Sequence, residues 1–248
     1  MNPFDFERML WHSSVQLVRV DGLVPDLFAS GALVDYGGNR LLLTVSHATG
    51  KPGRWAIQLK YVPGTGTQLF SLGPMNFLAK GSLFAVDAKL EDIDFSYAKV
   101  PGDLLAFRQQ IEPCAKTVEC QTAITVHKPS FLDIPEKGVN YGFCGTVRCA
   151  PDESLGETYV RREIRVYPGL SFVRTEQEYH YFSLPVPFPG HEHFRGCSGA
   201  PILSEDGAIV ALLCGGDADE KLVFGVSLRT YKVAIDILVG DIGTTGTP

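Results

Sequence analysis

The sequence lacks both a long apolar run and a surplus of basic side chains, and each absence excludes a class of function. A helix that spans a bilayer needs roughly 20 consecutive apolar residues, so we expect no transmembrane segment. Proteins that act mainly on nucleic acid usually carry a basic surface, whereas this chain of 248 residues has a formal net charge of −6. We therefore expect neither a membrane nor a nucleic acid as a partner.

The first residues also lack the apolar core of a secretory signal and carry two acids, Asp5 and Glu7. Without such a signal, the cysteines are expected to be reduced thiols in the cytoplasm rather than disulfides. No two of them form a Cys-x-x-Cys pair, which argues against a metal site. The 6 cysteines are Cys114, Cys120, Cys144, Cys149, Cys197 and Cys214.

Turn-forming residues divide most of the chain into short apolar runs. From Ser14 onward, Gly, Pro, Asp and Asn interrupt these runs often, which is typical of an antiparallel barrel or sandwich. The segment 35–39 predicts a hairpin turn. Pro101, Gly102 and Pro113 make 101–121 a candidate linker, or a crossing loop between two lobes, and a second series of short strands follows.

Both ends of the chain have a pattern of their own. Apolar residues within 1–13 predict a short helix or arm packed on the body for stability. The spacing in 230–240 predicts a C-terminal helix. The last residues are rich in Gly and Thr and are expected to be disordered.

One glycine-rich turn contains a serine that is a candidate nucleophile. In the segment 196–201, Gly196, Gly199 and Pro201 enforce a tight and irregular backbone around Ser198. Flexible glycines let backbone N–H groups point at one spot, which is what a developing oxyanion needs. The alternative is an ordinary surface turn between two strands.

Two other segments support the interpretation of 196–201 as part of a catalytic site. An apolar strand ends in Leu-Thr-Val-Ser-His at 43–47, and the run Asp-Phe-Ser-Tyr-Ala at 94–98 begins with an aspartate. Together with Gly-Cys-Ser-Gly-Ala-Pro at 196–201, they resemble the His, Asp and Ser segments of the trypsin/chymotrypsin-like serine peptidases, in the same order. The resemblance extends roughly over residues 14–235 and is close only at these segments.

The resemblance implies an all-β fold of two six-stranded antiparallel barrels with an active-site cleft between them. Residues 1–110 would hold an N-terminal arm and the first barrel, and 111–248 the second barrel with a C-terminal helix. A faint repeat supports two similar lobes, because Ser-Gly-Ala stands at both 30–32 and 198–200, each time ahead of a hairpin.

The resemblance also implies a serine endopeptidase without a cofactor, acting on peptides or proteins through an acyl-enzyme. Ser198 would be the nucleophile, His47 the general base and Asp94 the acid that orients the base. The amides of Gly196 and Ser198 would form the oxyanion hole. Asp92 lies on the same face of its strand and is the alternative acid.

Two cysteines depart from the family pattern. Cys197 replaces an aspartate that pairs with a newly cleaved N-terminus in many secreted relatives, so activation by that route is not expected. Cys214 stands where a serine often supports the catalytic aspartate, and a thiol is a weaker donor. Cys197 is also the alternative nucleophile, as in viral cysteine peptidases of this fold, although only Ser198 is followed by glycine.

The resemblance places a substrate pocket around Cys214, Gly215, Gly216 and Gly225. Two wall positions occupied by glycine would leave this pocket open, and Glu192 at its base would favour a basic side chain. The alternative places Glu192 on a solvated loop and leaves a pocket for bulky apolar residues. Two other functions stay open, a non-catalytic peptide-binding protein and an effector whose cleft is regulated by a partner protein.

Overall fold

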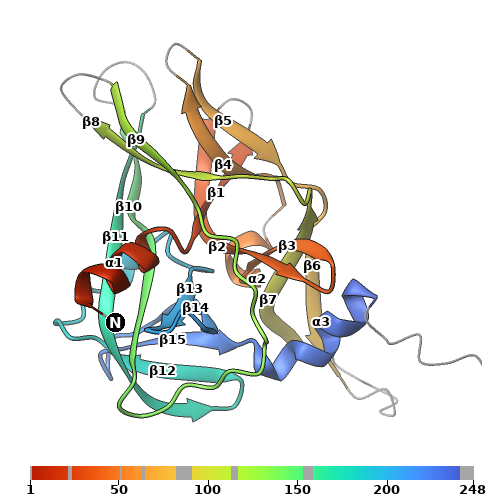
Figure 1. The fold of residues 1–248 in the computed structure, drawn as a ribbon, viewed down its shortest axis with the longest axis vertical. Coiled ribbons are helices and arrows are strands. Elements are labelled where there is room, and N and C mark those ends of the chain that lie inside the picture. The colour runs from red at the N-terminus through yellow and green to blue at the C-terminus, as the bar shows by residue number, and fades with distance from the viewer. Residues whose placement is uncertain are drawn as a thin grey trace, which may run out of the picture.

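The structure is a computed structural model, and it describes residues 2–21, 24–50, 52–62, 65–81, 91–112, 117–152 and 159–240. Strands make up most of it (Figure 1). None of the helices within these ranges is long and apolar enough to cross a membrane. The predictions for Cys114 and for the C-terminal tail fall outside the described residues.

The first lobe is one antiparallel sheet of seven strands in the order β5-β4-β1-β2-β3-β7-β6. The resemblance implied six strands here, and the exposed strands β5 and β6 lack the apolar alternation that predicts a strand. The strands are β1 (Val15–Asp21), β2 (Val24–Tyr36), β3 (Asn39–Thr44), β4 (Arg54–Val62), β5 (Gly66–Ser71), β6 (Asn76–Lys80) and β7 (Glu91–Val100).

The second lobe is a closed antiparallel barrel of six strands in the order β10-β11-β12-β15-β14-β13, as predicted. Its interior is lined by large side chains such as Tyr141, Phe143 and Phe182. The strands are β10 (Asn140–Asp152), β11 (Tyr159–Glu176), β12 (Tyr179–Ser183), β13 (Pro201–Ser204), β14 (Ile209–Asp217) and β15 (Leu222–Ser227).

The predicted linker contains a two-stranded ribbon, β8 (Phe107–Glu112) and β9 (Thr117–Ala123), so the expected boundary after residue 110 falls inside β8. Its sequence is polar and the two strands pair with each other, which is why no apolar pattern predicted them. After the ribbon the chain returns to the first lobe, where the amide of His127 donates to the carbonyl of Leu33.

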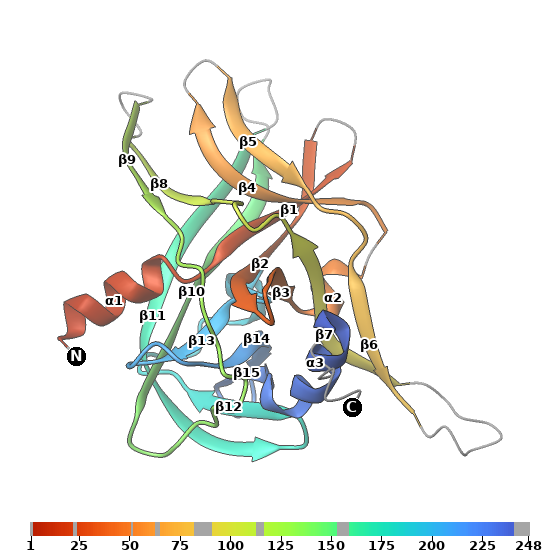
Figure 2. The same ribbon diagram turned by 45° about the vertical axis from the view of Figure 1, so that its right-hand side comes forward.

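Helices lie on opposite sides of the molecule (Figure 2). The N-terminal helix α1 (Pro3–Trp11) is capped by the side chain of Asn2 and buries Phe6 and Leu10. The predicted C-terminal helix is confirmed as η2 (Arg229–Tyr231) followed by α3 (Lys232–Val239). Two further helices of one turn each, α2 (Ser46–Thr49) and η1 (His191–Phe194), complete the set of described helices.

The strand β3 packs on both faces, and this arrangement positions the site. Leu42 belongs to the core of the first lobe, whereas Leu41 and Leu43 belong to a second core that also contains residues of the barrel such as Leu212 and Val226. Alternating side chains of β3 therefore pack into the core of the first lobe and into the core shared with the barrel. The end of β3, where α2 begins, is fixed at the junction between them.

Candidate active site

The structure brings together the three residues that the sequence predicts as a triad. The Nδ1 atom of His47 lies 3.0 and 2.8 Å from the two carboxylate oxygens of Asp94. Its Nε2 atom lies 3.0 Å from the Oγ atom of Ser198. His47 comes from α2, Asp94 from β7 beside it (Figure 2), and Ser198 from the turn that leads into β13. Hydrogen bonds thus connect the two lobes through one histidine.

Ser46 adds a contact that the sequence analysis did not predict. Its hydroxyl lies 3.1 Å from Oδ1 of Asp94 and 3.0 Å from the carbonyl of Ile93. The backbone amide of His47 donates to the same Oδ1 atom at 3.0 Å. The carboxylate is therefore held by the start of α2 as well as by the imidazole. The only signal in the sequence was the place of Ser46 directly before the histidine.

Asp94 is strongly biased toward its ionised form. Burial by itself would raise the pKa of this carboxyl. Hydrogen bonds and charge from His47, together with the thiol of Cys214, outweigh that effect and lower the pKa to about 2. The pKa of the Cys214 thiol is raised well above its usual value by burial and by the nearby carboxylate, and this thiol donates to the carbonyl of Leu212 at 3.5 Å.

Asp92, the alternative acid, occupies a different position. It is exposed and lines a cavity of about 730 Å³ beside His47, whereas the hydrogen bonds to the imidazole are made by Asp94. The rest of the lining includes the apolar side chains Phe77, Leu78, Ile93, Tyr179 and Phe224. This cavity offers an apolar surface directly next to the histidine.

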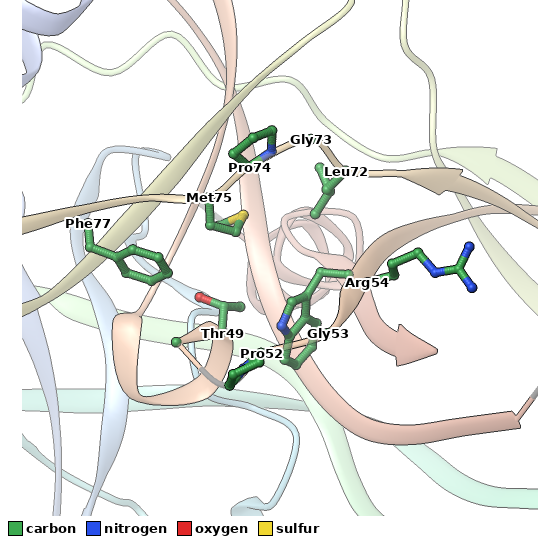
Figure 3. Close-up of a pocket in the computed structure, with 11 residues that line it drawn as sticks. Thr49, Pro52, Gly53, Arg54, Leu72, Gly73, Pro74, Met75 and Phe77 are labelled. Carbon is green, nitrogen blue, oxygen red and sulfur yellow. The ribbon is translucent and has the colours of Figure 1, made fainter. Parts of the chain in front are cut away.

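A second cavity of about 410 Å³ adjoins the other end of α2 (Figure 3). Figure 3 shows Thr49, Met75 and Phe77 around it and the guanidinium of Arg54 pointing away. Gly50 and Phe77 line both cavities. The hydroxyl of Thr49 bonds the carbonyl of Val45 at 3.0 Å, which holds this end of α2 in place.

The serine turn has the irregular backbone that its glycines predict. Gly196 and Gly199 have φ angles of 101° and 89°, a region that favours glycine. The amide of Ala200 donates to the carbonyl of Cys197 at 2.9 Å, so the N–H of that same peptide, which belongs to Ser198, points away from the turn. Within the described ranges, neither the amide of Gly196 nor that of Ser198 donates to a protein acceptor.

Ser30 holds this turn from the first lobe. Its hydroxyl donates to the carbonyl of Gly196 and its amide to the carbonyl of Ser198, both at 2.8 Å. The hydroxyl of Thr44 in turn donates to the carbonyl of Ser30 at 2.7 Å. A Cβ atom added to Gly199 would lie 2.2 Å from that carbonyl oxygen, so only glycine fits. In the sequence, Ser30 stands out only as part of a repeat.

Cys197 faces away from the histidine. Its side chain is buried in the barrel, and its thiol donates to the carbonyl of Thr146 at 3.2 Å. Gly145 makes room for it, because a Cβ atom there would lie 2.7 Å from the sulfur. The hydroxyl of Ser198, and not this thiol, therefore faces His47. In the described part of the chain no group of three or more His, Cys, Asp or Glu side chains is arranged to hold a metal ion.

The structure places the expected pocket residues in different environments, and the carboxylate of Glu192 is exposed. Glu192 lies on η1 with 91% of its side chain exposed, 3.7 Å from Arg195, because η1 is at the surface. Gly225 faces the inside of the barrel, where an added Cβ atom would lie 2.7 Å from the carbonyl of Leu212. The expectation of a shielded carboxylate at the base of a pocket is therefore corrected.

The other expected pocket residues, Cys214, Gly215 and Gly216, lie on β14 near Ser198. The hydroxyl of Ser198 lies 3.5 Å from the carbonyl of Cys214. Gly215 packs on the ring of Phe224, at 3.5 Å from an added Cβ atom. Gly216 is buried beneath the ring of Phe188, which the sequence analysis did not single out.

Comparisons with known proteins support the fold and not a particular activity. No protein-family model and no curated protein matches the sequence. Solved structures that match include a serine endoprotease from Yersinia pestis, at 12% identity over 97% of this chain and 68% of that one, with a TM-score of 0.54. Neuropsin, a serine protease of mouse brain, matches at 12% identity over 94% and 95%, with a TM-score of 0.55.

Human heparin binding protein matches to a similar degree, at 13% identity over 96% of both chains, with a TM-score of 0.53. The architecture and these matches define the class. The chain has the trypsin/chymotrypsin-like fold, as the sequence segments predicted. Structures with this fold bear the names of proteases and of a binding protein, so function has to be argued from the site.

Proposed function

We propose that this protein is a serine endopeptidase that hydrolyses peptide bonds through an acyl-enzyme on Ser198. One observation carries the proposal, namely the unbroken chain of hydrogen bonds from Asp94 through His47 to Ser198. A serine hydroxyl is a weak nucleophile unless a base contacts it, and the base needs a fixed tautomer. Both conditions are supported by the contacts of the imidazole.

In the proposed reaction, Nε2 of His47 takes the proton from Oγ of Ser198 as the oxygen attacks the peptide carbonyl carbon. The carboxylate of Asp94 accepts a hydrogen bond from Nδ1–H and stabilises the imidazolium. The negative oxygen of the tetrahedral intermediate would accept from the amides of Gly196 and Ser198, which have no protein acceptor among the described residues.

Collapse of the intermediate breaks the C–N bond, and the imidazolium gives its proton to the leaving amine. The acyl group then stays on Ser198 as an ester. A water molecule, deprotonated by His47, attacks this ester. The imidazolium returns the proton to Oγ of Ser198 as the C–O bond breaks, which releases the carboxylic acid and regenerates the enzyme. No cofactor takes part in these steps.

Peptides or proteins are the proposed substrates. The apolar cavity beside His47 would accept the side chain of a neighbouring substrate residue. Regulation of the cleft by a partner protein, expected from the sequence as an alternative, stays a prediction. The opposing proposal, a peptide-binding protein without catalysis, predicts that the hydroxyl of Ser198 has no special reactivity.

Labelling with a small fluorophosphonate distinguishes the serine endopeptidase from the non-catalytic peptide-binding protein. The native protein is expected to be labelled at Ser198, the variant Ser198→Ala to be inert, and Cys197→Ala to keep most of the labelling because the thiol faces the barrel. An inert native protein, or labelling lost only in Cys197→Ala, would contradict the proposal. New N-termini produced from an unfolded protein substrate would then establish endopeptidase activity.

A further inference from the structure

The ring of Phe188 occupies the space in front of Gly216. A Cβ atom built on Gly216 would lie 2.3 and 2.5 Å from the Cε2 and Cζ atoms of the ring, so the ring lies directly against the backbone. The ring centroid is 5.6 Å from those of Phe194 and His191. Because Phe194 is part of the buried core of the barrel, Phe188 is anchored to a rigid element.

Gly216 lies close to the nucleophile. The carbonyl of Cys214 is 3.5 Å from the hydroxyl of Ser198, and Gly216 is two residues further along β14. At about 3.3 Å per residue, this places it roughly 7 Å along the strand. A phenylalanine or arginine side chain of a bound substrate spans about that distance.

The edge of β14 next to the nucleophile is open to a substrate. Its pairing with β13 ends at Leu212, whereas its pairing with β15 continues to Asp217. In the described part of the chain, residues 215–217 therefore have a strand partner on one side only, and an extended peptide can pair with the other. The residue whose carbonyl faces Ser198 would then direct its side chain into the space near Gly216.

We propose that Phe188 determines specificity at this position by filling that space, so that the residue acylating Ser198 must be small, namely Gly, Ala or Ser. This inference rests on the proposed function. It replaces selection of a basic residue by Glu192, because a carboxylate with 91% of its side chain exposed is solvated and pairs weakly.

A larger side chain would have to displace the ring and separate it from Phe194. Sites of this kind discriminate by about 10-fold to 200-fold per methylene group. We therefore expect the native protein to prefer alanine over phenylalanine at this position by about 10²-fold. Removal of the ring is expected to abolish most of that preference.

The experiment compares two peptidyl diphenyl phosphonates that differ only in the residue bearing the phosphorus, alanine or phenylalanine. Both react covalently with an active serine, so labelling rates report fit without turnover. The variants are Phe188→Ala, the milder Phe188→Val, and Phe172→Ala as the matched control. Phe172 packs against the same barrel core, next to His180 and Phe182.

We expect the alanine probe to label the native protein and Phe172→Ala faster by about 10²-fold. In Phe188→Ala the phenylalanine probe should gain about 10-fold or more while the alanine probe changes little, with Phe188→Val in between. Faster labelling of the native protein by the phenylalanine probe, or an unchanged preference in both Phe188 variants, would overturn the inference.

A small fluorophosphonate without any side chain separates this inference from the proposed function. If it fails to label Ser198 in the native protein, the proposed function itself is wrong. If it labels Ser198 while the alanine probe stays inert, the proposed function stands and the specificity inference is overturned.

Discussion

The amide of Ser30 donates a hydrogen bond to the carbonyl of Ser198 at 2.8 Å, which joins the two lobes at the candidate nucleophile. The hydroxyl of Ser30 adds a second bond, to the carbonyl of Gly196. Both carbonyls are thereby held toward the first lobe. The shape of the serine turn thus depends on a residue whose hydrogen bonds, among the described residues, go to Gly196, Ser198 and Thr44 rather than to His47 or Asp94.

Replacing Ser30 by alanine tests this dependence. The variant loses the bond to Gly196 and keeps the backbone bond, so we expect kcat to fall by about 10-fold with little change in KM, because a single hydrogen bond contributes about 0.5–1.5 kcal/mol. Ser13→Ala is the matched control. This buried serine lies away from the site, and its hydroxyl donates to the carbonyl of Leu10 with a hydrogen-bond length of 2.7 Å. Equal effects of the two variants on kcat would contradict a positioning role.

Replacement of Asp94 and replacement of Asp92 are expected to differ greatly in their effect on kcat. Asp94→Asn should lower kcat by about 10⁴, because an amide favours the wrong tautomer of the histidine. Asp92→Asn, on the same strand and exposed, should change kcat by only a few-fold. Steady-state kinetics on one peptide substrate measures both. A reversed order would show that the wrong carboxylate has been assigned to the histidine.

Ser46 should contribute less than the aspartate it contacts. Ser46→Ala removes one donor from Oδ1 of Asp94 and leaves the amide of His47 in place. We expect a decrease in kcat of about 10-fold, since a hydrogen bond to a charged group contributes about 1.5–3 kcal/mol and the hydroxyl is shared with Ile93. Ser46→Thr, which keeps the hydroxyl, should retain more activity than Ser46→Ala, and the reverse order would count against this contact.

The lowered pKa of Asp94 predicts a specific dependence of stability on pH. Its pKa falls from 3.8 to about 2 on folding, so its contribution is fully present above pH 3.8 and is lost as the pH falls through about 2. At about 1.4 kcal/mol per pKa unit, this contribution is about 2 kcal/mol. Urea unfolding at pH 5 and near pH 2 should therefore show a smaller loss of stability in Asp94→Asn than in the native protein, and equal losses would contradict the assignment.

Each of the three candidate triad residues has a local signature in the sequence. His47 follows a buried strand, Asp94 begins another, and Ser198 stands between glycines whose positive φ angles the structure confirms. The six-stranded second barrel and the C-terminal helix followed from the same resemblance and from apolar periodicity. Local pattern and fold thus agree in these segments.

Other features depend on contacts between distant residues and leave no local signature. Ser30 reaches Gly196 across the lobes, and Phe188 covers Gly216 from a loop of irregular sequence. The resemblance implies Glu192 at the base of a pocket, whereas the structure places it, exposed, on the short helix η1. The cytoplasmic location and the state of Cys114, Cys120 and Cys149 stay predictions.

The most direct test of the account is the detection of an acyl-enzyme. Mixing the native protein with excess p-nitrophenyl acetate should release a burst of about one equivalent of p-nitrophenol, and peptide mapping at the end of the burst should place the acetyl group on Ser198. Ser198→Ala should show neither the burst nor the acetylated peptide. Absence of a burst together with an unmodified Ser198, or acetylation confined to another residue, would contradict catalysis by this serine.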